Sequence, residues 1–144
     1  MKKLLTVIAF LLPLSIVHSQ PLLTNSNTID ERLYAVFDKQ YLESVKTDDP
    51  MLLERWHFYL DNAFLISDSP PSKNEKTKTY PSVLIADLSN INILKLEKEQ
   101  DLKHDFYAET IYKIEGTQQF LIYLPGRDFV EKFNAHWHLK ISKQ

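Results

Sequence analysis

Apolar residues recur at helical spacing in two stretches near the start of the chain. In residues 29–46 they fall three or four positions apart, and Thr28 with Glu31 three residues later has the spacing of a capping box. A second apolar stripe occupies residues 50–61, where Asp49 suits the N-cap and the following proline suits the first helical turn. The pattern therefore predicts two helices, and the short link between them favours an antiparallel pair.

Shorter apolar runs in the middle of the chain predict strands. Residues 63–66 and 83–86 are brief apolar runs of strand length. Residues 91–96 alternate with one slip, which a strand with a β-bulge would explain and a short helix would fit as well. The charged stretch 97–105 is typical of a solvated segment or a turn of helix. The polar, proline-containing stretch 67–82 predicts a loop, and its composition favours a flexible one over a functional one.

The clearest pattern is a β-hairpin over residues 110–124. Gly116 fits the first position of a two-residue type II′ turn, where a positive φ is required. This turn sets four cross-strand pairs: Ile111 with Ile122, Lys113 with Phe120, Tyr112 with Leu121, and Ile114 with Gln119. Both faces are apolar, so the hairpin either lies inside a covered sheet or presents an aromatic face to a partner. The candidate interaction surface comprises Tyr112, Ile114, Leu121 and Tyr123.

A last helix is predicted over residues 128–137. Asp128 suits its N-cap with Glu131 at the third helical position, and aromatic residues recur every four positions from Phe129 to Trp137. The chain thus runs from two helices through several strands to a helix. This order predicts an α+β domain, with an antiparallel sheet of about four to five strands covered by helices.

The first 19 residues have the features of a secretory signal peptide. Two lysines precede an apolar run over residues 4–17, which is shorter than the ~20 residues of a membrane-spanning helix and is interrupted by Pro13. Residues 17–19 resemble a signal-peptidase site. We therefore expect export to the periplasm or beyond, and a single mature domain over residues 20–144 that is not inserted in a membrane. An uncleaved membrane anchor is the alternative.

Composition narrows the classes of function. The chain has no cysteine, which excludes disulfides, thiolate metal sites and a lipid anchor on an N-terminal cysteine. Its formal net charge is −2, and removal of the signal lysines makes the mature domain more acidic. That balance disfavours nucleic acid and anionic membrane surfaces as partners. With only two glycines, the glycine-rich loops that bind dinucleotides and phosphates are excluded.

Two groups of acidic residues with a histidine have spacings that suit a metal ion. The first group lies on one side of the second predicted helix and comprises Glu54, His57 and Asp61. The second converges if the charged stretch is helical, and comprises Asp101, His104 and Asp105. Carboxylates and imidazoles suit zinc or iron, but di-iron bundles use the Glu-x-x-His motif twice. Solvated charge is the simpler interpretation, so the sequence assigns no metal, cofactor or catalytic residue.

Two further features lie near the end of the chain. Arg127, before the last predicted helix, could bind an anion, although pairing with a nearby carboxylate is the simpler interpretation. His136 and His138 flank Trp137. Residues two apart in a helix point roughly 200° from each other, so these histidines would not form one site. We expect Trp137 in the core with the histidines beside it.

The leading expectation is a non-enzymatic binding or interaction protein of the bacterial cell envelope, with a protein partner or a small ligand. Aromatic residues make up 12% of the chain, and such residues dominate interface hot spots. A small periplasmic metal-binding protein or hydrolase that uses the histidines is one alternative. An inhibitor or immunity protein is another.

Overall fold

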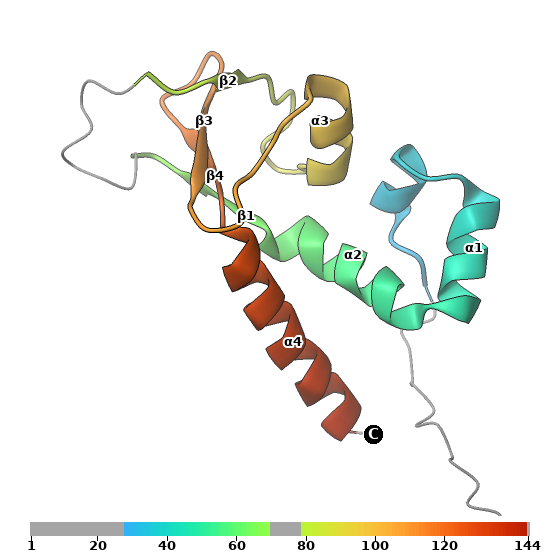
Figure 1. The fold of residues 1–144 in the computed structure, drawn as a ribbon. Helices are drawn as coiled ribbons and strands as arrows, with labels where there is room; N and C mark the ends of the chain where they lie inside the picture. Colours follow the sequence, from blue (N-terminus) through green and yellow to red (C-terminus); the bar gives the residue numbers. More distant parts are fainter. Residues whose placement is uncertain (1–27, 70–78, 144) are drawn as a thin grey trace, which may run out of the picture.

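The computed structural model describes residues 28–69 and 79–143 (Figure 1). The predicted signal peptide and residues 70–78 of the predicted loop lie outside this range. The described part has an α+β architecture, with four α-helices and a mixed four-stranded sheet. Within these residues, no helix combines the length and the apolar character needed to span a lipid bilayer.

The first predicted helix is instead two short helices. A 3₁₀ helix, η1 (Glu31–Ala35), is followed by α1 (Lys39–Asp48), so the prediction of one helix over residues 29–46 is wrong. Asp30 caps η1 by accepting a hydrogen bond from the backbone of the 3₁₀ helix, in place of the predicted capping box. Asp38 has an extended backbone and caps α1. At each of these two aspartates the backbone changes from extended to helical, and helical periodicity alone does not reveal such a change.

The second helix begins as predicted. Asp49 is the N-cap of α2 (Pro50–Asn62), and its Oδ1 accepts a hydrogen bond of 3.0 Å from the Leu52 backbone. α1 packs on α2, and the ring of Phe37 between η1 and α1 stacks on Trp56 with centroids 4.4 Å apart. The aromatic stack fixes the N-terminal helices on one side of α2.

Four strands form one sheet in the order β1-β4-β3-β2. They are β1 (Phe64–Ser67), β2 (Ser82–Val83), β3 (Thr110–Ile114) and β4 (Phe120–Tyr123). β4 pairs antiparallel with β3, as the predicted hairpin requires, and also with β1 on its other side. β2 runs parallel to β3, so the sheet is mixed and not antiparallel throughout as predicted. β2 is therefore an edge strand whose outer side is not paired with another strand of the described sheet.

Residues 91–96 do not form the predicted strand. The side chain of Asn92 accepts a hydrogen bond of 3.1 Å from the Lys95 backbone and starts helix α3 (Ile93–Gln100). The helix ends at Asp101, whose left-handed backbone has φ 49°. The slip in the alternation thus marked the change from an extended to a helical period, which agrees with the helical alternative.

The register of the predicted hairpin is confirmed, but its turn is different. β3 and β4 pair Ile111 with Ile122, Tyr112 with Leu121, and Lys113 with Phe120. The turn begins one residue earlier than predicted, because the Thr117 backbone and hydroxyl both donate to the Ile114 carbonyl. Gly116, with φ 71°, then occupies the third position of the turn.

The last helix, α4 (Gly126–Ser142), is longer than predicted at both ends. Pro125 precedes it without a side-chain cap, and Asp128 lies in its first turn instead of capping it. Phe129 and Phe133 are buried, and Trp137 packs beside them. The predicted aromatic ridge therefore attaches α4 to the domain.

The main core lies between one face of the sheet and the helices η1, α1, α2 and α3, whereas α4 extends from the end of the strands (Figure 1). The sheet contributes Tyr112, Ile114, Leu121 and Tyr123. The helices contribute Leu42, Val45, Leu53, Leu60 and Ile93. These four sheet residues were the predicted interaction surface, and that prediction is corrected: the helices cover them.

Candidate functional site

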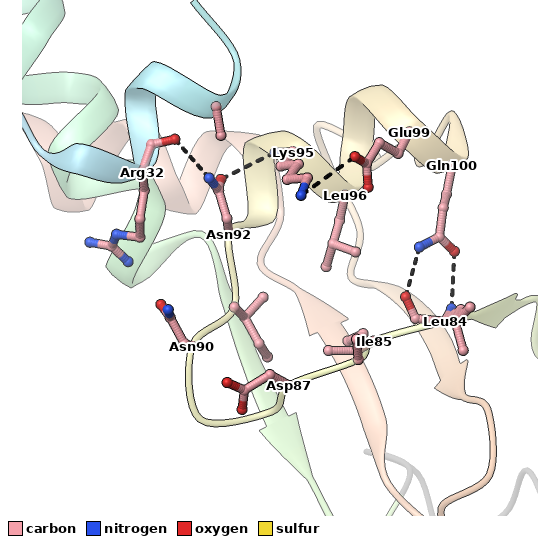
Figure 2. A pocket seen from close by; sticks show the side chains of 13 residues that line it. Arg32, Leu84, Ile85, Asp87, Asn90, Asn92, Lys95, Leu96, Glu99 and Gln100 are labelled. Carbon is pink, nitrogen blue, oxygen red and sulfur yellow. Dashed lines mark hydrogen bonds and ion pairs between the residues drawn. The ribbon is translucent and has the colours of Figure 1, made fainter.

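A groove of about 440 Å³ lies between α3, the end of η1 and the segment of residues 84–91. Figure 2 shows this segment running along α3, with Leu96 and Gln100 pointing from the helix toward it. Ile85, Ile91 and Leu96 line the groove with apolar surface. Its polar lining consists of Arg32, Asp87, Asn90, Asn92, Lys95, Glu99 and Gln100. We call this feature the α3 groove.

Asn92 holds one end of the α3 groove together. Its Oδ1 caps α3, while its Nδ2 donates a hydrogen bond of 2.7 Å to the Arg32 carbonyl of η1. Ile91 and Ile93, on either side of it, are buried and anchor the start of the helix. One side chain thus fixes η1 and α3 relative to each other, 60 residues apart in the chain.

The other wall of the groove is shaped by a turn at Asp87. Asp87 Oδ1 accepts hydrogen bonds from the Ser89 hydroxyl at 2.6 Å and from the Ser89 backbone at 2.9 Å. The Ser89 hydroxyl, followed by the backbone donors, lowers the pKa of Asp87 below its ordinary value. A negative charge is therefore maintained at this rim of the groove.

The side chain of Gln100 closes the far end. Its Nε2 donates to the Leu84 carbonyl at 2.7 Å, and its Oε1 accepts from the Leu84 amide at 3.0 Å (Figure 2). One carboxamide thus pairs with both backbone groups of one residue just beyond β2. This is the contact that an additional strand would make at the edge of a sheet.

The charged groups around the α3 groove include both signs. Lys95 Nζ lies 3.7 Å from Glu99 Oε1 on the exposed side of α3. Arg32 is bound on two sides, by Asp30 at 2.6 Å and by Asp61 at 2.8 Å, and the hydrogen bond that its guanidinium donates to Asp30 raises the pKa of Arg32 above the ordinary value. The groove thus presents amides and paired charges around an apolar floor.

The structure does not bring the first predicted polar cluster together. Glu54 contacts α4, and His57 Nε2 accepts a hydrogen bond of 3.2 Å from the Asp30 backbone. Asp61 pairs with Arg32. Burial lowers the pKa of His57, which favours the neutral ring that can accept this bond. The three side chains serve three separate contacts between elements.

The second predicted cluster also separates. Asp101 is exposed and lies 3.5 Å from Lys103, while Asp105 Oδ1 accepts hydrogen bonds from the Tyr107 and Ala108 backbones. His104 turns the other way and stacks on Tyr123 with ring centroids 5.2 Å apart. Within the described residues, no group of three or more histidines and acids is arranged to hold a metal ion.

His104 belongs to a polar cluster that the sequence did not reveal. The Tyr59 hydroxyl donates a hydrogen bond of 2.6 Å to Glu97 Oε1 and lies 3.4 Å from His104 Nδ1. Tyr123 is 1% exposed, and its hydroxyl has no hydrogen-bond partner among the described residues. Burial and the Glu97 carboxylate raise the pKa of both tyrosines. In the sequence, the only indication of this polar cluster was Glu97, an acidic residue directly after the apolar Leu96.

The features predicted at the end of the chain are placed as follows. Arg127 Nε donates to Asp128 Oδ1 at 3.1 Å on the surface, so the predicted carboxylate pairing is confirmed. His136 faces α2, where it contacts Glu54, whereas His138 is exposed. The two histidines lie in one helix and do not share a site, as their spacing predicted.

The α3 groove itself was missed because it depends on the way residues 84–91 run along α3 and on contact with η1, which the sequence pattern did not reveal. The available signal was the run of turn-forming residues from Asp87 to Asn90 between apolar neighbours. Comparison of the chain with protein-family models, with curated proteins and with solved structures found no match. Function is therefore inferred from the geometry of the α3 groove.

Proposed function

We propose that this chain is an exported, non-enzymatic binding protein of the bacterial cell envelope, and that the α3 groove holds its ligand or part of a protein partner. The observation that carries the proposal is the groove of about 440 Å³. Binding sites for small molecules and side chains have volumes of about 300–1,000 Å³, an apolar lining and a few placed polar groups. The α3 groove has all three properties.

The lining supports recognition of a polar or mixed ligand. Ile85 and Leu96 provide apolar contact, while Asn90 and Gln100 offer amide donors and acceptors. Lys95 and Asp87 place a cation and an anion on opposite walls. A ligand with both signs of charge, or a peptide with its alternating donors and acceptors, has complementary chemistry.

The contacts that the histidines make also favour a binding protein over the alternative of a hydrolase. His57 and His136 are engaged in contacts that join α2 to the N-terminal segment and to α4. His104 stacks on the buried ring of Tyr123. Three candidate acid-base residues therefore have structural contacts, and none of them lines the α3 groove.

Crosslinking from the groove tests this function. A photoreactive amino acid replaces Leu84, which lines the groove and is 59% exposed, in cells that produce the protein natively. Leu139 on α4 is the matched control, because it is the same residue type and is 61% exposed. We expect a discrete adduct from position 84 and none from position 139. Equal adducts from both positions, or none from either, would contradict the proposal.

A further inference from the structure

Just beyond the end of β2, the outer edge of the backbone at Leu84 is covered by a side chain. The Lys113 and Glu115 amides of the hairpin donate to the Pro81 and Val83 carbonyls, at 2.8 and 2.9 Å. Because the backbone groups of successive residues in a strand point to opposite edges, those of Leu84 face away from β3. There they meet the carboxamide of Gln100 at 2.7 and 3.0 Å.

We propose that the ligand of the α3 groove is an extended peptide segment of a protein partner, which pairs with this edge in the place of Gln100. The inference rests on the proposed function and names the chemistry of its ligand. The Gln100 carboxamide has the donor and acceptor of a peptide group, so the groups of Leu84 that it satisfies are those that a neighbouring strand would satisfy. Strand addition to an exposed sheet edge is a general mode of peptide recognition.

The position of Gln100 would allow a peptide to replace its side chain at the Leu84 backbone. It is the last residue of α3, its side chain is exposed, and the left-handed backbone of Asp101 follows it. The long side chain can rotate into solvent without any movement of the helix. An unpaired edge strand is prone to nonspecific pairing, so a removable side chain protects it while leaving it available.

The groove beside the edge accounts for selectivity. Side chains of a strand alternate, so every second residue of a peptide paired with Leu84 would face the α3 groove. Ile85 and Leu96 would meet an apolar residue there, and Lys95 with Glu99 would meet polar groups at its rim. Backbone pairing would supply affinity and the groove would supply sequence preference.

The test is selection of a random heptapeptide library on the mature protein, followed by titration calorimetry with the best peptide. Gln100→Ala removes the competing amide, and from the net value of two hydrogen bonds we expect about fivefold to hundredfold tighter binding. Leu84→Pro removes the edge N–H, and binding should weaken at least about tenfold. Methylation of alternate amides of the peptide, in the register that pairs with Leu84, should weaken binding to the unaltered protein in the same way.

The peptide modification keeps the test valid if Leu84→Pro does not fold. Enrichment of no peptide, or peptides that bind equally well with methylated amides, would overturn strand pairing. If position 84 still captures a partner by crosslinking in that case, the proposed function stands and only the ligand class is wrong. If crosslinking fails as well, both are wrong.

Discussion

Glu54 on α2 and His136 on α4 are joined by a contact of 2.8 Å between Oε1 and Nε2. Lys140, one helical turn later, adds a bond of 2.6 Å to the other carboxylate oxygen. Burial raises the pKa of Glu54, but the bonds from Lys140 and His136 outweigh it and hold the pKa below the ordinary value. The histidine of α4 that suggested metal chemistry thus attaches the helix to the domain.

Replacement of this carboxylate should loosen α4. Glu54→Gln removes the charge that both α4 donors approach, and we expect a loss of about 1–3 kcal/mol in the free energy of unfolding. His138→Gln, at the exposed histidine of the same helix, should change it by less than about 0.5 kcal/mol. Urea denaturation of the two variants measures the difference. Equal effects would show that Glu54 does not hold the helix.

Stability should fall with acid through His57. Because burial lowers its pKa in the folded state, the neutral ring stabilises the fold above the unfolded pKa of about 6.5. That contribution is lost as the pH falls through the lowered folded value, since protonation removes the acceptor for the Asp30 amide. His57→Gln should reduce the loss of stability between pH 7.5 and 5. An unchanged pH dependence in the variant would refute this role.

Tyr59, which is partly buried, and Tyr123, which is buried, should respond differently to loss of the hydroxyl. Tyr59→Phe leaves the Glu97 carboxylate without its 2.6 Å donor, so it should lower the free energy of unfolding by about 1–2 kcal/mol. Tyr123→Phe removes a hydroxyl that has no partner among the described residues, so it should be neutral or stabilising. Thermal or urea unfolding of the two variants measures the difference in stability. A larger cost for Tyr123→Phe would indicate that its hydroxyl is satisfied in solution.

Local patterns predicted those parts of the fold that depend on neighbouring residues. The hairpin register followed from the alternation around Gly116, and the start of α2 followed from Asp49 and its proline. The break at Asp38 and the cap at Asn92 were missed because aspartate and asparagine also suit solvated positions inside a periodic run. A polar residue reveals a cap only when the backbone before it is known to be extended.

The candidate site could not be derived in the same way. The hairpin pattern showed two apolar faces, and the sequence did not reveal that α2 and α3 cover the one with Tyr112 and Tyr123. The pairing of Gln100 with Leu84 joins residues 16 apart through a helix end that the sequence left undefined. Such contacts follow from the packing of α3 against the sheet edge, which no local periodicity encodes.

The most direct test of the α3 groove as the binding site is crosslinking from position 84 in a protein whose groove has been filled. Ala86→Trp places a large side chain in the groove, and Ala135→Trp places the same side chain at an exposed position of α4. If the groove holds the partner, the adduct from position 84 should be lost with Ala86→Trp and retained with Ala135→Trp, at equal protein levels. An adduct of the same yield in both backgrounds would contradict the account.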